Sequence, residues 1–469
     1  MIFNSIPFIV FALLFFAAWP RVQKNNNAKW LWICTMSFVF YAWWDWRFMF
    51  LLLGTGSVDY MCGQQIYRSE KRKKFWLTVS MVTNIASLCF FKYSVWLVHE
   101  FNDWMNDIGF TTCFADTIPE YSLVLPIGIS FYTFNSMSYA IDLYRGKAEP
   151  AKNVLHFMAF ISFFPHLVAG PIIRAKEVLV QLNKSHQLNK LQIVNACKTI
   201  LWGFFLKMVL ADNIAIMVNA QFDVIHTSTD SLTWWYCMIG FAFQIYFDFN
   251  GYSSIARGLA KLCGIHFRLN FNHPYLSGSF SEFWRRWHIS LSSFFKDYVY
   301  ISLGGNRKGK WRSEWNRWIT MLLSGLWHGA NFTFIIWGTL HAFFLSIENL
   351  YRRYFASRIP ALTFKKYPII VFIGVLVAWV FFRASSLDDA LFVVRNMFAF
   401  NHKAKWMELI SNSASVWILI GVFVELYPLY KKFINPLKHW IIQGLFWALV
   451  ACMLVFFRGE EQGFIYFQF

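Results

Sequence analysis

Apolar runs of the length that crosses a lipid bilayer recur along this chain. A helix needs about 20 apolar residues to span the hydrocarbon core, and about eleven such runs can be drawn, several of them short or broken. They are Ile2–Trp19, Trp30–Leu53, Phe75–Val98, Tyr121–Tyr144, Leu155–Ile172, Ile193–Val218, Leu232–Phe249, Trp318–Ile347, Pro368–Phe382, Val416–Tyr427 and Trp440–Phe457.

The composition excludes a soluble globular fold. Only 14% of the 469 residues are charged, against roughly 25% in soluble domains. We predict an all-α integral membrane protein with shorter re-entrant and amphipathic helices. No Pro-rich or Ser-rich linker and no repeat of fixed period divides the sequence, so we expect one membrane domain over residues 1–469. The first run lacks the marks of a cleaved signal peptide and is expected to stay as a helix.

The charge pattern predicts how the chain is oriented. There are 43 Lys and Arg against 25 Asp and Glu, a net charge of +18. In a soluble chain this would suggest nucleic acid, but here the cations lie between apolar runs, as in loops that face anionic lipid. We therefore expect lipid contact, no nucleic-acid partner, and cytoplasmic loops at residues 21–29, 68–74 and 145–152.

Two of these basic loops flank residues 30–65, so this stretch is predicted to cross twice, with a turn near Asp45 and Arg47. The amino terminus would then face outward. The loop His99–Glu120 has no Lys or Arg and is placed outside.

The eight cysteines are scattered singly, without a CxxC pair, and several lie inside apolar runs. This spacing predicts neither a disulfide framework nor a thiolate metal site.

The stretch Ala256–Arg317 breaks the apolar pattern. It holds eleven Lys or Arg interleaved with many aromatic residues, which is typical of amphipathic helices at the membrane interface. Within it, residues 281–295 carry apolar side chains at helical spacing and predict one amphipathic helix. Gly304, Gly305 and Gly309 predict a loop after it.

Several common catalytic motifs are missing from the sequence. It contains no GxxxxGK[ST], HExxH or GxSxG pattern and no His followed five positions later by Asp. An ATPase, a zinc protease, a serine hydrolase and a glycerolipid acyltransferase therefore lack their usual sequence support.

The strongest polar signal is His328, in the run LLSGLWHGAN of residues 322–331. An ionisable side chain inside the membrane is costly and suggests function, and an imidazole can exchange a proton near neutral pH. The alternative is a buried histidine that only bonds a neighbouring helix.

Asn331 and His341 are further candidates for substrate binding. His341 follows thirteen residues later, about 220° around one unbroken helix, so it could not share the face of His328 there.

Four further residues are candidates. His288 lies on the predicted interfacial helix and is a candidate for a functional role; the alternative is a snorkelling side chain. Arg285 and Arg286 could bind a phosphate-bearing donor, or only lipid headgroups. Asp248 could orient a histidine or pair with an arginine, or only mark a helix end before Gly251.

Proline and glycine break the run around His166. Pro165, Gly170 and Pro171 predict irregular backbone that lines a cavity, because such backbone is not tolerated against lipid.

These motifs together resemble the membrane-bound O-acyltransferase (MBOAT) family, in its alginate O-acetylation and peptidoglycan O-acetyltransferase-like branch. The likeness runs nearly end to end and is far more specific than one histidine. One departure is His166, where the family pattern leads us to expect glutamine. The segments that carry the likeness are LPIGISFYTFNSMSYAIDLYRG (125–146), FPHLVAGPIIR (164–174), FDFNGY (247–252), FWRRWHISL (283–291), LGGNR (303–307), GLWHGA (325–330) and FIYFQF (464–469).

The resemblance implies a funnel across the bilayer, with His328 as the catalytic histidine and His288 as the second signature position. It implies transfer of an acetyl group from a cytoplasmic thioester, acetyl-CoA, which is used as substrate and not held permanently. It also implies an extracytoplasmic esterase-like acetyltransferase partner that acts on an envelope polysaccharide, in the bacterial inner membrane. Two rival functions stay open: a secondary transporter or flippase, and a non-catalytic scaffold for envelope assembly.

Overall fold

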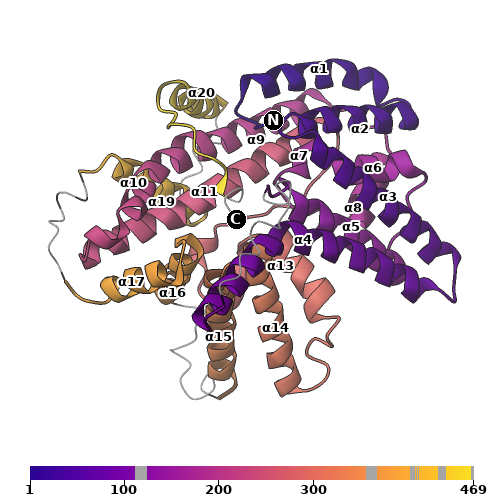
Figure 1. Ribbon diagram of the computed structural model, residues 1–469. Helices are drawn as coiled ribbons and strands as arrows, with labels where there is room; N and C mark the ends of the chain where they lie inside the picture. Colours follow the sequence, from indigo (N-terminus) through magenta and orange to yellow (C-terminus); the bar gives the residue numbers. More distant parts are fainter. Residues whose placement is uncertain are drawn as a thin grey trace. The chain divides into compact units, whose positions relative to one another are not determined.

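The structure is a computed structural model that describes residues 1–110, 124–354, 367–401, 407, 409, 411–430 and 440–465. These residues form helices joined by turns, and no strand occurs among them (Figure 1). The all-helical prediction is therefore confirmed for this part of the chain. By their internal contacts the residues form two compact units, residues 1–200 with 255–268, and residues 201–254 with 269–469.

The first unit is built mainly from eight helices and includes the start of α9 (Lys190–Phe204) and the end of α11 (Ser231–Leu262). Its core lies between α2, α3, α5 and α6, where aromatic and aliphatic side chains are buried. The eight are α1 (Ile6–Val22), α2 (Asn26–Ala42), α3 (Arg47–Arg68), α4 (Lys73–Asp107), α5 (Ile129–Tyr144), α6 (Val154–Ser162), α7 (Phe164–Leu167) and α8 (Ala175–Leu182).

The turn expected near Asp45 and Arg47 is confirmed. Helix α2 ends at Ala42 and α3 begins at Arg47, and the Arg47 guanidinium lies 2.6 Å from the Asp45 carboxylate. Hydrogen bonds from Arg47 hold the pKa of the Asp45 carboxyl below its usual value, because they stabilise the charged form. The pair gives the tight turn a local cap.

The prediction that the loop His99–Glu120 begins at His99 is wrong, whereas its placement outside stays a prediction. Helix α4 continues to Asp107, so residues 99–107 are helical. Helix α4 is also joined to α3 by a buried polar cluster, in which the Asp59 carboxylate accepts from Ser80 Oγ at 2.5 Å and from Asn84 Nδ2 at 2.8 Å. Residues 111–120 of the loop lie outside the described residues.

The irregular backbone expected around His166 is confirmed. Helix α6 ends at Ser162, α7 lasts only four residues, and residues 168–174 are not helical. Asn135 of α5 supports this segment, since its Oδ1 accepts from the Ile173 N–H at 3.1 Å. His166 is buried between the rings of Phe163 and Phe267. Whether the segment lines a cavity stays a prediction.

The second unit contains the remaining described helices and most of α11. Its most extensive helix pair is α14 (Lys310–His328) with α15 (Phe332–Tyr354), which run side by side (Figure 1). The others are η3 (Phe205–Ala211), α10 (Asp212–Asp223), η4 (Ile225–Thr227), η5 (Pro274–Leu276), α12 (Phe280–Arg286), α13 (Ile289–Phe294), η6 (Phe295–Tyr300), α16 (Pro368–Arg383), α17 (Leu387–Met397), α19 (Ala414–Tyr430) and α20 (Trp440–Phe456).

Two predicted helices of this unit are broken. The run Trp318–Ile347 is divided at residues 329–331 between α14 and α15. The single amphipathic helix expected over residues 281–295 is divided at Trp287 and His288 between α12 and α13. Both breaks fall at candidate catalytic histidines.

Two helical stretches are long and apolar enough to cross a membrane alone, Lys73–Asp107 and Lys190–Asp223. Four shorter apolar helices, α1, α16, α19 and α20, have 16 or 17 residues. The number of about eleven crossings, the orientation and the single-domain organisation stay predictions.

Candidate active site

His328 is the last residue of α14, and the chain turns back into α15 after three residues. The two helices approach closely because glycines face each other. A Cβ on Gly338 would lie 2.6 Å from the Met321 carbonyl oxygen and 3.4 Å from the Gly325 Cα. Small residues permit such close backbone contact between membrane helices. The pair fixes how α15 is rotated against His328.

Asn331 holds the turn between these helices. Its Oδ1 accepts from the Thr333 N–H at 3.0 Å, as an N-cap of α15, and its Nδ2 donates to the Ser385 carbonyl at 2.9 Å. The amide predicted to bind substrate therefore has structural partners on both sides. Its substrate role stays a prediction.

The broken helix brings His328 and His341 to the same aromatic side chain. The ring centroid of Trp337 lies 4.8 Å from that of His328 and 4.8 Å from that of His341. Both histidines are buried. The separation of 220° expected for an unbroken helix does not apply, because α15 folds back along α14. The Phe382 ring, 5.1 Å from His328, closes another side.

His288 is fully buried, so the interpretation as a snorkelling side chain is wrong. It joins α12 to α13 with φ of 41°, in the left-handed region, and its Nδ1 accepts from the Leu291 N–H at 3.4 Å. Its ring lies 4.6 Å from Phe249 and 6.1 Å from Trp327, whose ring is 4.9 Å from His328. The Trp327 ring therefore contacts both candidate catalytic histidines.

Asn270 fixes the backbone at His288, and sequence reasoning missed it. Its carbonyl accepts from the Ile289 N–H at 2.8 Å, and its Oδ1 accepts from Ser290 Oγ at 2.9 Å. Its Nδ2 donates to Ser253 Oγ of α11 at 3.2 Å. A single asparagine in a polar stretch gives no sequence signal for this role, because its partners are distant in the chain.

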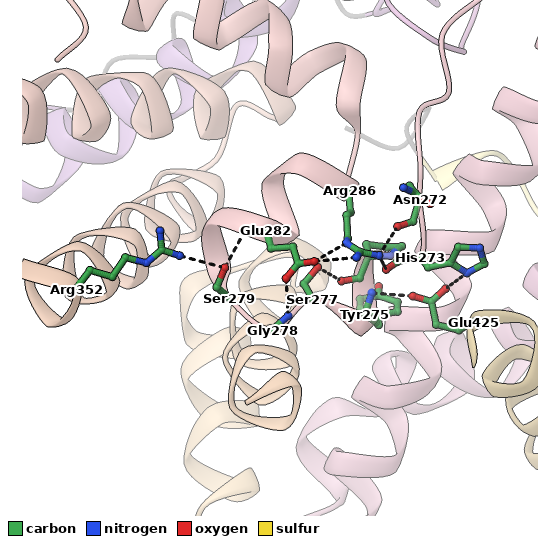
Figure 2. A network of polar contacts seen from close by, with 11 residues as sticks. Asn272, His273, Tyr275, Ser277, Gly278, Ser279, Glu282, Arg286, Arg352 and Glu425 are labelled. Carbon is green, nitrogen blue, oxygen red and sulfur yellow. Dashed lines mark hydrogen bonds and ion pairs between the residues drawn. The ribbon is translucent and has the colours of Figure 1, made fainter. Parts of the chain in front are cut away.

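The two candidate arginines differ in their surroundings. Arg285 is exposed, whereas Arg286 lies 2.8 Å from the Glu282 carboxylate and also donates to the carbonyls of Asn272 and His273 (Figure 2). Arg286 thus holds the loop before α12 against that helix. Arg285 is the more exposed of the two.

The loop before α12 is held on its other side by Glu425 of α19. The buried Glu425 carboxylate accepts from the Tyr275 N–H at 2.8 Å and lies 3.3 Å from His273 Nδ1 (Figure 2). The network in Figure 2 also includes Ser279, the N-cap of α12, which accepts from Arg352 of α15.

Asp248 lies inside α11, so the interpretation as a helix end is wrong. It pairs with Lys207 at 2.7 Å, a lysine and not the arginine or histidine expected. Lys207 also lies 2.7 Å from Asp212, and all three are buried. A lysine inside the apolar run 193–218 was a signal for this cluster, since membrane-buried charges need partners.

The Lys207 cluster, formed by Lys207, Asp212 and Asp248, holds the segment 457–465. The Gln462 carbonyl accepts from Lys207 at 3.0 Å, and the Ile465 N–H donates to Asp248 at 2.7 Å. Phe464 is buried against Phe249, the residue that contacts His288. Residues 466–469 of the predicted FIYFQF motif lie outside the described residues.

Comparison with known proteins identifies the family. The sequence model of the MBOAT, membrane-bound O-acyltransferase family matches residues 151–387, which include His288, His328 and His341. The chain belongs to the membrane-bound O-acyltransferase family. It is therefore an acyltransferase, and the predicted family resemblance is confirmed.

The relatives of this MBOAT protein are named for the modification of alginate, peptidoglycan and teichoic acid. It is 39% identical over 409 residues to a probable alginate O-acetylase AlgI of Pseudomonas aeruginosa, covering 85% of this chain and 75% of the relative. It is 35% identical to a peptidoglycan O-acetyltransferase of Helicobacter pylori, over 86% of this chain and 80% of the relative. A teichoic acid D-alanyltransferase of Bacillus subtilis is 28% identical, over 50% and 62%.

Among the described residues, no three His, Cys, Asp or Glu side chains gather closely enough to hold a metal ion. The candidate site presents buried imidazole and indole rings and a buried set of paired charges.

Proposed function

We propose that this acyltransferase passes an acetyl group from cytoplasmic acetyl-CoA across the inner membrane, for O-acetylation of an envelope polysaccharide. The observation that supports the proposal is that His328 and His288, two buried imidazoles, both contact the ring of Trp327. The names of relatives at 35–39% identity over most of the chain support acetyl as the group and alginate or peptidoglycan as the polymer.

His328 is the proposed general base. It accepts the proton of the attacking hydroxyl while the hydroxyl oxygen bonds to the thioester carbonyl carbon. The carbon–sulfur bond then breaks, and the imidazolium returns the proton to the leaving thiolate. The products are an O-acetyl ester and the free thiol. A thioester is already activated, so positioning and proton transfer are the main tasks of the protein.

His288 is proposed to act on the donor, as the second catalytic histidine. Its left-handed backbone and the contacts of Asn270 fix the direction of its ring. Arg285 is proposed to attract the phosphates of the coenzyme, because its charge is exposed at the start of this motif. Arg286, Asp248, Asn331 and His341 complete the proposed binding residues, the first three through the backbone that they hold.

An extracytoplasmic esterase-like acetyltransferase is the proposed partner, which completes transfer onto the polymer. A coenzyme thioester is charged and confined to the cytoplasm, whereas the polysaccharide lies outside. A passage through the protein, as in the proposed funnel, would connect the two sides. Acetyl-CoA is a substrate in this scheme and does not stay bound.

The test uses the full chain in liposomes. Radiolabelled acetyl-CoA is supplied on the side of the membrane where the basic loops lie, and the partner with its polymer is placed on the opposite side. We expect label on the polymer with the wild type, and loss of at least 100-fold in rate with His328→Ala. His266→Ala, at an exposed histidine, is the matched control and should keep full activity. Full transfer by His328→Ala would support a scaffold, and movement of unreacted acetyl-CoA would support a transporter.

A further inference from the structure

Five nitrogen atoms around Trp337 are buried and have no hydrogen-bond partner among the described residues. They are the indole Nε1 atoms of Trp284, Trp337 and Trp379 and both ring nitrogens of His341. More than nine in ten buried polar groups in folded proteins have a partner. Five orphan atoms on neighbouring rings make this cluster a candidate binding site.

The orphan atoms belong to rings in mutual contact. Trp337 and His341 are one turn apart on α15, with ring centroids 4.8 Å apart. The Trp284 ring of α12 lies 5.0 Å from His341 and 5.7 Å from Trp337, and the Trp379 ring of α16 lies 6.1 Å from Trp337. Because Gly338 fixes α15 against α14, this group of rings is held next to His328.

The chemistry of these atoms selects the kind of group that fits. An indole N–H donates and cannot accept, and a neutral imidazole offers one donor and one acceptor. The cluster therefore has four donors and one acceptor. An oxygen acceptor can accept from two of these donors at once, whereas an ammonium group would leave all four donors unpaired. A thioester carbonyl oxygen and a water molecule both have this chemistry.

We propose that the Trp337 N–H and His341 bind the carbonyl oxygen of the acyl group, with Trp284 holding the His341 ring. This assignment rests on the proposed function. As the hydroxyl oxygen bonds to the carbonyl carbon, the π electron pair moves onto the carbonyl oxygen, and it returns when the carbon–sulfur bond breaks. Donors already placed in a water-excluded site stabilise that transient charge without reorganisation. The centroid contact of 4.8 Å between Trp337 and His328 places them beside the base.

Infrared spectroscopy of the bound carbonyl tests this directly. The His328→Ala protein is loaded with acetyl-CoA labelled with ¹³C at the carbonyl, so that no turnover occurs. We expect the carbonyl stretch at lower frequency than in free acetyl-CoA. Trp337→Phe in the same background removes the N–H and keeps an aromatic ring, and should move the stretch back toward the free value. Trp315→Phe, at an exposed indole of α14, is the control and should leave it unchanged.

Kinetics give a second readout. With His328 present, Trp337→Phe should lower kcat about 100-fold with little change in KM, as when one donor to a developing oxyanion is lost. His341→Leu should have a similar effect, whereas His341→Gln keeps an N–H and should recover part of the rate. Thermal unfolding of each variant in detergent shows whether it is folded, and the Gln variant keeps the test open if the Leu variant is not.

The outcomes separate this assignment from the function on which it rests. A bound carbonyl whose frequency is the same with Trp337 and with Phe at this position overturns the assignment alone; the orphan atoms then bind water. Absence of any bound carbonyl signal in His328→Ala overturns acetyl-CoA as donor and the assignment with it.

Discussion

Trp337 contacts His328 and His341 at the same centroid distance, 4.8 Å, although the two histidines belong to different helices. The contact exists because α14 ends at His328 and α15 returns along it. The close glycine packing of this pair therefore positions the proposed base and the proposed binding residues together.

Gly338→Ala should damage both stability and activity. The new methyl group would lie 2.6 Å from the Met321 carbonyl oxygen, closer than real contacts allow, so α15 must move away from α14. We expect a loss of about 1–3 kcal/mol in the free energy of unfolding and a clear fall in acetyl transfer. Thermal unfolding in detergent and the liposome assay measure the two effects.

Gly444→Ala is the matched control for this change. A Cβ at Gly444 meets no atom within 4 Å, and alanine in a helix is favoured over glycine by about 1 kcal/mol. The control should be as stable as the wild type or more so. Equal behaviour of the two alanine variants would show that the glycine contact does not matter.

Two substitutions of His288 should separate the role of its imidazole in the reaction from its role in the backbone conformation. His288→Ala removes the imidazole, places alanine in the left-handed region and loses the cap of α13, at a cost of about 1–3 kcal/mol in unfolding free energy. His288→Asn also removes the imidazole, but asparagine tolerates this conformation and can cap the helix.

Both variants should lose acetyl transfer, and only the alanine variant should unfold earlier on heating. Transfer by the asparagine variant at the wild-type rate would reduce His288 to a structural cap. Asn272→Ala, at an exposed neighbour of Asn270, serves as the neutral control for both measurements.

The stability of variants in the Lys207 cluster should fall with the amount of unpaired charge that remains buried. Lys207→Met leaves Asp212 and Asp248 without their cation, and we expect a loss of about 3–5 kcal/mol. Asp248→Asn leaves one lysine with one carboxylate and keeps an acceptor for the Ile465 N–H, so its loss should be smaller. Thermal unfolding in detergent gives the order.

The same variants should release the segment 457–465, which Lys207 and Asp248 hold. Trypsin cleavage after the exposed Arg458 should therefore be fastest with Lys207→Met. Asp388→Asn, at an exposed carboxylate outside the cluster, should cleave as slowly as the wild type. The reverse order of Lys207→Met and Asp248→Asn would contradict this account of the buried charges.

Features encoded locally could be predicted from the sequence. The turn at Asp45 and Arg47 follows from two basic loops around one long apolar run, and the irregular segment near His166 follows from its prolines and glycines. His288 and His328 became candidates because ionisable residues in apolar surroundings are unusual, and because both lie in the family motifs; their roles stay predictions.

Features that depend on distant contacts could not be predicted. Gly251 suggested that α11 ends near Asp248, but the helix continues, and a Cβ at Gly251 would lie 2.7 Å from the Gly203 carbonyl oxygen. This glycine permits close packing and does not end the helix. The break at His288 likewise depends on Asn270, eighteen residues earlier, so the local pattern of residues 281–295 gave one helix where there are two.

Arg285 and Arg286 should respond differently to the same substitution. Arg286→Ala removes the ion pair with Glu282 and the hydrogen bonds to two loop carbonyls, so the protein should unfold earlier on heating. Arg285 is exposed. Arg285→Ala should leave the unfolding temperature unchanged and raise the KM for acetyl-CoA several-fold with little change in kcat, since only attraction of the donor phosphates is lost.

Arg285→Lys should recover part of the affinity, because lysine keeps the charge without the planar fork. The effect on KM should shrink as salt is raised, because exposed charges are screened. An unchanged KM at low salt would assign Arg285 to lipid headgroups and leave donor binding to other residues.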